Sequence, residues 1–163
     1  MRFALLFFLL LFAVGCDSGD VGGPIPTFEE LRDAYTEPEF GTGLVREGSN
    51  YRGGGYAVEA EYLLFEVGTQ RQAHINLDRV DSLVGIGIIL PLNVGLEDLQ
   101  PGMELNASFT YGGEGDGKSG VGRFYVTAAD SSRVAGVFAA DLVSSGLVPS
   151  DLRMTGAVNA TVQ

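Results

Sequence analysis

Hydrophobic and polar residues alternate along most of the chain after residue 42. Residues 104–111 read ELNASFTY and residues 152–162 read LRMTGAVNATV, with apolar residues at every second position over most of each segment. A period of two is typical of antiparallel strands with one buried face. The pattern predicts further strands at residues 56–67, 70–77, 83–92, 123–128 and 134–142, and a candidate edge strand at residues 43–47.

Seven or eight short strands joined by glycine-rich turns indicate an all-β fold, either an antiparallel β-sandwich or a small barrel. We favour the sandwich because the predicted loops are uneven in length. Several glycines fall within predicted strands, which indicates bulges or sharp bends; they include Gly85, Gly87, Gly136 and Gly156. The sequence contains no visible repeat or second domain, so residues 27–163 are predicted to form a single domain.

A short helix is predicted ahead of the strands. Thr27 and Glu30 have the spacing of a capping box, in which each side chain bonds to the backbone of the other residue. An apolar stripe continues through residues 28–35, and Pro38 follows it. We expect this helix to cover one end of the sheet.

The first 15 residues have the pattern of a signal peptide. Arg2 precedes an apolar run at residues 3–14, which at about 1.5 Å per residue reaches about 18 Å, short of a ~30 Å membrane core. Residues 13–16 read AVGC and resemble the bacterial lipobox, in which the cysteine is acylated and becomes the mature N-terminus. Cys16 is the only cysteine of the chain, so it has no partner for an internal disulfide.

These features predict a lipid-anchored, exported protein. Residues 1–15 form the signal peptide, Cys16 carries the lipid, and residues 16–26 provide a flexible tether of small, polar and proline residues. A diacylglyceryl group with an N-acyl chain binds membranes more firmly than the single chain that anchors only marginally. We expect a protein of the bacterial cell envelope, anchored to the outer membrane, with its orientation toward the surface or the periplasm left open.

The charge balance restricts the partners. The chain has 10 Lys and Arg against 21 Asp and Glu, a net charge of −11, and loss of Arg2 with the signal peptide makes it −12 (−11 − 1). Nucleic acids and anionic membrane surfaces bind basic patches, so neither is an expected partner. An acidic chain suits solubility, a saline habitat or a cationic partner, and composition does not separate these.

One segment matches a nucleotide-binding motif. Residues 112–119 read GGEGDGKS, which fits G-x-x-x-x-G-K-[ST]. A working phosphate loop requires a helix after it, whereas residues 120–127 have the pattern of a strand. We interpret the segment as a hairpin loop and expect no nucleotide or other cofactor. Its acids Glu114 and Asp116 are weak candidate calcium ligands, because calcium takes six to eight oxygens.

The other polar residues form no catalytic set. His74 is the only histidine, so it lacks the further ligands of a zinc site, and no nucleophile-elbow pattern accompanies it. Glu59 and Glu61 share a strand face about 7 Å apart at a rise of ~3.3 Å per residue, whereas glycosidases place their acids on opposite sides of a substrate. We expect surface positions for all three residues and a protein that is not an enzyme.

Tyr125 is the best candidate for a contact surface. It lies on the predicted outer face of residues 123–128, where Arg123 and Thr127 flank it. An exposed tyrosine ring in this position can stack on a sugar, although such a tyrosine more often pairs with a neighbouring strand.

The C-terminal third resembles a group of uncharacterised small lipoproteins of Gram-negative bacteria. The resemblance rests on GRFYVT at residues 122–127, on VAGVF at residues 134–138 after Asp130, and on MTGAV at residues 154–158. In that group a hairpin with an acidic turn leads to a glycine-x-phenylalanine strand and to a last strand rich in valine and threonine. Over residues 100–163 the resemblance implies a β-sandwich and a lipid anchor, but no active site.

The signal peptide, the lipobox-like segment and the lack of a catalytic set in the sequence together predict a lipid-anchored envelope protein that binds an unknown ligand. An accessory subunit of an envelope assembly is the alternative, and an exposed apolar patch on one sheet face would favour it. A hydrolase that uses carboxylates alone is a third hypothesis, which requires two acids in a concave site.

Overall fold

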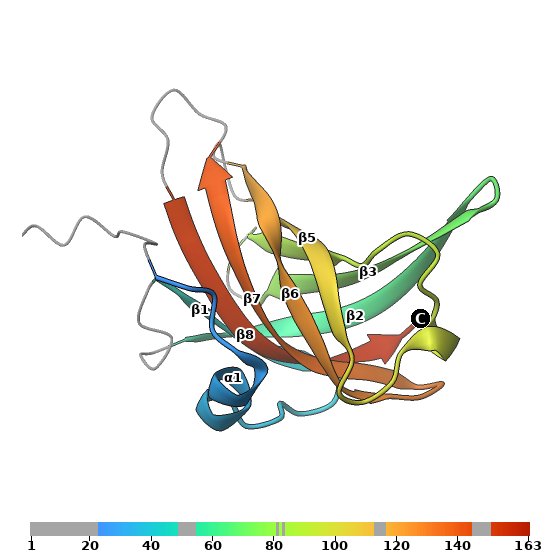
Figure 1. Cartoon of the computed structure of the whole chain (residues 1–163), viewed down its shortest axis with the longest axis horizontal. Helices are drawn as coiled ribbons and strands as arrows, with labels where there is room; N and C mark the ends of the chain where they lie inside the picture. Colours follow the sequence, from blue (N-terminus) through green and yellow to red (C-terminus); the bar gives the residue numbers. More distant parts are fainter. Residues whose placement is uncertain (1–22, 49–54, 81, 83, 113–116, 145–150) are drawn as a thin grey trace, which may run out of the picture.

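The computed structural model describes residues 23–48, 55–80, 82, 84–112, 117–144 and 151–163 (Figure 1). The elements in chain order are α1 (Phe28–Ala34), β1 (Thr42–Glu47), β2 (Tyr56–Val67), β3 (Gln70–Arg79), β4 (Gly85–Ile89), the 3-10 turn η1 (Leu96–Asp98), β5 (Glu104–Gly112), β6 (Lys118–Ala129), β7 (Arg133–Ser144) and β8 (Asp151–Val162). The prediction of an all-β fold with one short N-terminal helix is confirmed.

The strands form a closed eight-stranded barrel in sequence order. Each strand pairs antiparallel with its neighbour along the chain, and β1 pairs with β8 from Thr42 opposite Asn159 to Glu47 opposite Met154. The choice of a sandwich over a barrel was therefore wrong, and residues 43–47 are not an edge strand. Alternation reports which side chains are buried, but it does not report whether the first strand also pairs with the last.

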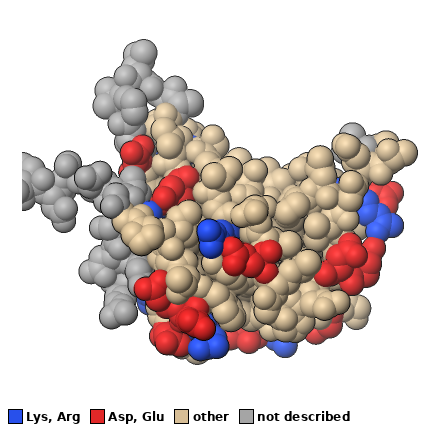
Figure 2. All heavy atoms as spheres, viewed as in Figure 1, with Lys and Arg blue, Asp and Glu red and all other residues tan. Residues whose placement is uncertain are grey.

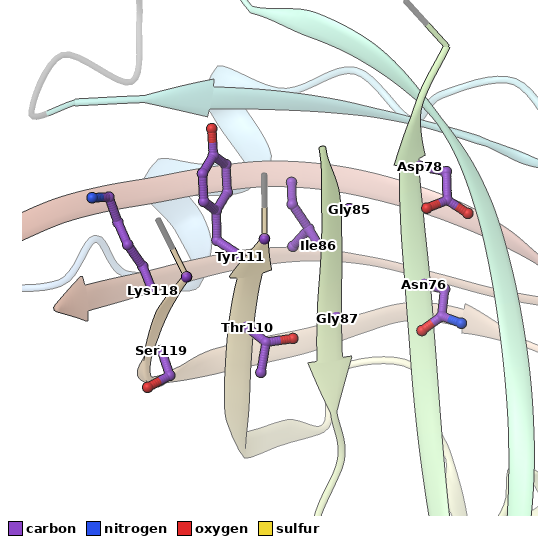
Figure 3. Close-up of a pocket in the computed structure, with 11 residues that line it drawn as sticks. Asn76, Asp78, Gly85, Ile86, Gly87, Thr110, Tyr111, Lys118 and Ser119 are labelled. Carbon is purple, nitrogen blue, oxygen red and sulfur yellow. The ribbon is translucent and has the colours of Figure 1, made fainter. Parts of the chain in front are cut away.

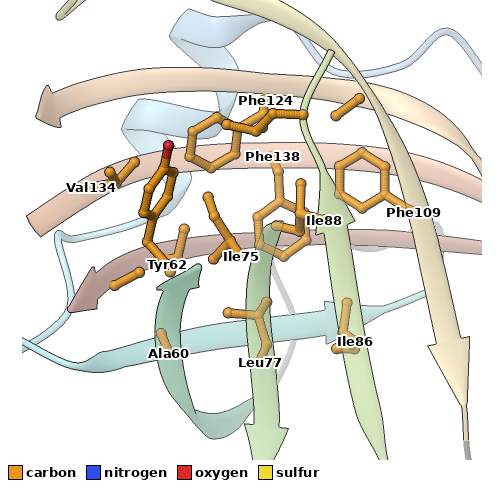
Figure 4. Close-up of a cluster of buried hydrophobic side chains, with 14 of the residues drawn as sticks. Ala60, Tyr62, Ile75, Leu77, Ile86, Ile88, Phe109, Phe124, Val134 and Phe138 are labelled. Carbon is orange, nitrogen blue, oxygen red and sulfur yellow. The ribbon is translucent and has the colours of Figure 1, made fainter. Parts of the chain in front are cut away.

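Large rings fill the barrel interior above glycines. Figure 4 shows Tyr62, Phe109, Phe124 and Phe138 inside the barrel, and all four are fully buried. A Cβ on Gly136 would lie 2.5 Å from the Phe124 ring and 2.5 Å from the carbonyl oxygen of Tyr125. These contacts are far inside van der Waals distance, so the interior packing requires a glycine at this position.

Gly156 has the same role one strand further on. A Cβ there would lie 2.5 Å from the Phe138 ring and 2.7 Å from the carbonyl oxygen of Leu44. The predicted irregularity at strand glycines is seen in β6, where the register shifts between Val126 and Ala128 and Val126 pairs with Gly136. Glycines thus let the long strands curve while the rings pack over them.

Helix α1 covers the outer wall of the barrel rather than one end of a sheet (Figure 1). The capping box between Thr27 and Glu30 is confirmed. The buried side chains of Leu31 and Tyr35 pack against outward-facing residues of β6, β7 and β8, and the hydroxyls of Tyr35 and Thr155 lie 2.6 Å apart. The helix and this wall form a second, smaller apolar core.

Residues 23–26, assigned to the tether by the sequence, contact the same wall. Arg153 is held by Asp141 in a bidentate pair with distances of 2.7 and 2.8 Å. The same guanidinium donates to the carbonyl oxygens of Gly23 at 2.6 Å and Pro24 at 3.1 Å. The N-terminal segment is therefore fixed on the barrel from Gly23 onward. No helix among the described residues combines the length and the apolar character needed to cross a membrane.

We predict that Gly136→Ala lowers the free energy of unfolding by about 1–3 kcal/mol, the usual cost of overpacking a core. The measurement is urea unfolding of the mature chain carrying Cys16→Ser in both the reference and the variant. Gly112→Ala is the matched control, because a Cβ at Gly112 meets nothing within 4 Å. Equal stability of the Gly136 variant and the reference would contradict the packing of Phe124 over this glycine.

Candidate functional site

The predicted contact surface at Tyr125 is covered. Tyr125 lies on the outer face of β6 as predicted, but it is only 4% exposed because α1 packs over it. Its ring centre lies 5.3 Å from that of Phe28. Arg123 remains exposed and pairs with Glu104 at 3.0 Å. Tyr125 is thus unavailable to a ligand, and the correction follows from the helix, which the strand pattern does not report.

Other predicted site residues lie outside the described residues, namely Cys16, Glu114 and Asp116. The segment after the nucleotide-motif match is strand β6, which begins at Lys118, so the strand predicted there is confirmed. In the described part of the chain, no three His, Cys, Asp or Glu side chains gather in a way that could hold a metal ion.

His74, Glu59 and Glu61 all lie on the outer wall. Glu59 and Glu61 are exposed, and Glu59 stands directly opposite Asp78 of β3. His74 is half-buried, with its ring centre 4.8 Å from that of Phe65. Burial lowers the pKa of His74, and its buried Nε2 has no hydrogen-bond partner among the described residues. The histidine therefore stays neutral over a wider pH range than an exposed one.

A groove crosses the outer wall at β3, β4, β5 and the start of β6, with a volume of about 530 Å³. Figure 3 shows its arrangement: Asn76 and Asp78 lie along β3, Thr110 lies on β5, and the segment of β4 between them has no side chains at Gly85 and Gly87. The groove exists because a stretch of backbone is left bare between two rows of polar side chains.

The glycines of the groove differ from those of the barrel interior. A Cβ on Gly85 would meet only the carboxylate oxygen of Asp78, at 3.3 Å, and one on Gly112 would meet nothing within 4 Å. A Cβ on Gly87 would lie 2.6 Å from Oγ1 of Thr110, the end of a side chain that can rotate. By contrast, Gly136 and Gly156 face backbone oxygens and packed rings. Packing therefore leaves room for a side chain at Gly85 and at Gly112, and another cause must account for these two glycines.

The groove walls carry both hydrogen-bond donors and acceptors. Asn76 contributes an amide, Asp78 a carboxylate, and Thr110 and Ser119 contribute hydroxyls, while Lys118 supplies one ammonium group. Asp78 is the one carboxylate among the described lining residues, so the charges of Asp78 and Lys118 balance. Such a surface can hold a polar ligand through several hydrogen bonds.

A second hollow of about 400 Å³ lies at the adjoining end of the barrel and shares Tyr111 with the groove. Tyr56 donates to Glu47 at 2.6 Å, and the guanidinium of Arg79 lies 4.5 Å from the centre of the Tyr56 ring. Burial and the neighbouring Glu47 carboxylate raise the pKa values of Tyr56 and Tyr111. Both phenols therefore remain protonated, and able to donate, at any physiological pH.

Sequence reasoning missed this groove. The available signal was the pair Gly85 and Gly87, two residues apart on one face of a predicted strand, but such glycines also mark bulges. Their meaning depends on the strands beside them, and the pairing of Gly87 with Asn76 and Thr110 is known only from the fold.

Comparisons of the chain with protein-family models, with curated protein sequences and with solved structures found no match. The fold alone defines the class: an eight-stranded antiparallel barrel with a helix on its outer wall. The groove must therefore be interpreted from its own residues.

We predict that Gly85→Val raises the free energy of unfolding by about 0.5–1 kcal/mol, because a β-branched residue suits a strand better than glycine. A Cβ at Gly85 meets only the flexible end of Asp78. Urea unfolding measures the change, and Gly156→Val, which must collide with Phe138, is the control expected to lose stability. A loss at Gly85 as large as that at Gly156 would show that folding requires both glycines.

The buried His74 predicts a pH dependence. Its folded pKa lies below the ordinary value of 6.5, so the unfolded chain binds the proton first as the pH falls. Stability from the neutral histidine is present above about pH 6.5 and decreases below it. As the pH is lowered from about 7.5 to about 5.5, wild type should therefore lose stability that His74→Gln does not lose. Urea unfolding of both proteins at each pH measures the difference. A constant difference between the two proteins would contradict the burial argument.

Proposed function

We propose that this protein is a lipid-anchored envelope protein that binds a ligand, without catalysis, in the groove over β4. The observation that carries the binding role is the bare floor formed by Gly85, Gly87 and Gly112, where packing leaves room for a side chain at Gly85 and at Gly112. Glycine weakens a strand, and a glycine inside a strand often marks close approach of a ligand to the backbone. Gly85 and Gly112 lower the stability of the strands, and packing does not require them. Their presence therefore supports a binding role.

The anchor is supported by the sequence around Cys16 and by the way the chain joins the barrel. Arg153 fixes Gly23 and Pro24 on the wall, and seven residues from Cys16 reach at most about 25 Å. Gly23 lies near the start of β8, at the barrel end where β4 begins and β5 ends. A lipid on Cys16 would therefore hold that end of the barrel close to the membrane.

A role as an accessory subunit is the second candidate. Leu64 and Phe65 are 41% and 44% exposed on the β2–β3 hairpin, which projects from the barrel away from α1 (Figure 1). Exposed apolar side chains on a projecting element favour contact with another protein. On the face shown in Figure 2, charged side chains form separate clusters with broad uncharged surface between them.

The carboxylate hydrolase gains no support from the groove. Asp78 is the one carboxylate among its described lining residues. Glycoside hydrolysis by the usual mechanism requires a pair of acids that flank the scissile bond. We therefore retain binding as the proposed activity.

We predict that Cys16→Ser moves the protein from the membrane fraction to the soluble fraction of broken Gram-negative cells, because the lipid provides the only firm attachment. Ser18→Ala is the matched control and should stay with the membranes. Protease treatment of intact cells then distinguishes a surface domain, which is degraded, from a periplasmic one, which is protected. If Cys16→Ser sediments with the membranes as the wild type does, the proposed anchor is wrong.

A further inference from the structure

We infer that the groove binds a neutral carbohydrate chain, and that the chain continues past Tyr111 into the hollow at the barrel end. This inference rests on the proposed binding role of the groove and specifies its ligand. It is carried by the hydrogen-bonding groups of the walls, the bare glycine floor and Tyr111, which lines both hollows.

The charges of the groove argue against an ionic ligand. Its described lining has one carboxylate, Asp78, and one ammonium group, Lys118, so the described part of the lining has no excess of either sign. The chain as a whole carries a net charge of −11, which opposes a polyanion. No described cluster of acids could hold a metal ion. The remaining polar ligands are neutral.

The pairing of the strands argues against a peptide. Peptides that bind to sheets usually add a strand to a free edge. Both neighbours of β4 are in place, since its residues pair with β3 from Gly85 to Ile89 and with β5 over the same stretch. The backbone of the groove floor is therefore already hydrogen-bonded within the barrel, and a ligand must be held by the side chains of the walls.

Those side chains suit hydroxyl groups. The Asp78 carboxylate and the Asn76 amide are planar groups with two polar atoms each, and such groups can bond two neighbouring hydroxyls at once. Thr110 and Ser119 lie on the other side of the floor and can both donate and accept. Without a Cβ at Gly85 and Gly87, a flat sugar ring can approach the backbone closely.

The second hollow extends the site. Tyr111 lines both hollows, and Tyr56, Glu47 and Arg79 complete the second one. Tyrosine combines an apolar ring face with a polar hydroxyl, the two surfaces that a sugar ring presents. Glu47 and Arg79 add further hydrogen-bonding groups beside these rings. Two hollows of about 530 and 400 Å³ that share the lining residue Tyr111 suit a chain of several sugar units rather than a single one.

The test is an NMR titration of the ¹⁵N-labelled mature chain carrying Cys16→Ser. The neutral probes are maltohexaose, cellohexaose and hexa-N-acetylchitohexaose, and the charged probes are hexagalacturonate and hexalysine. We expect at least one neutral hexasaccharide to shift the amide signals of Gly85, Gly87 and Gly112 in a saturable way. Gly85→Val should weaken this binding about tenfold or more, whereas Ala57→Val, on the exposed outer face of β2, should leave it unchanged.

Tyr111→Leu tests the extension into the second hollow, because leucine retains the apolar contact with the barrel core. It should weaken binding of the hexasaccharide by a larger factor than binding of the corresponding disaccharide. An equal loss for both lengths, or for neither, would overturn the extended site.

The outcomes separate this inference from the proposed function. If only a charged probe shifts the groove amides, the groove remains a binding site and the neutral carbohydrate is wrong. If no probe shifts them, or if Gly85→Val binds the hexasaccharide as well as the reference does, the inference is overturned. The anchor is judged independently by the fractionation of Cys16→Ser.

Discussion

Closure of the barrel depends on the packing of phenylalanine rings over glycines. An eight-stranded barrel has an interior just wide enough for side chains to fill. The rings of Phe124 and Phe138 occupy the places where Gly136 and Gly156 have no side chains. A larger residue at either position would collide with these rings and with backbone oxygens, and would strain the pairing of the strands that close the barrel. The burial of every other inward-facing residue follows from this closure.

Closure also divides the outer surface into two walls with different roles. Helix α1 covers the wall made by β6, β7 and β8, and residues 23–26 lie against it through Arg153. In a ring of eight strands, β4 lies opposite β8, so most of the groove lies on strands away from the helix, and it reaches β6 only at Lys118 and Ser119. The polypeptide before the barrel is thus secured on one side of the barrel, and the groove lies largely on the other.

Alternation along the sequence was sufficient to predict the strands, because burial of one face imposes a period of two on segments such as residues 104–111. It did not predict closure, since residues 43–47 have the same pattern whether they pair on one side or on two. It also placed Tyr125 on the outer face correctly but could not report that Phe28 and the helix cover it. The groove could not be predicted for a related reason. Gly85 and Gly87 form a groove floor only because Asn76 and Thr110, which are distant in sequence, lie on the neighbouring strands.

Two kinds of strand glycine therefore coexist in this barrel, and only their surroundings distinguish them. Each costs roughly 0.5–1 kcal/mol relative to alanine. For Gly136 and Gly156 the cost is offset within the fold, because the rings above them bury large apolar areas. For Gly85 and Gly112, no packing interaction offsets this destabilisation, since a side chain could be added with little or no backbone movement. The proposed binding role would account for this destabilisation, because function can require residues that lower the stability of the fold.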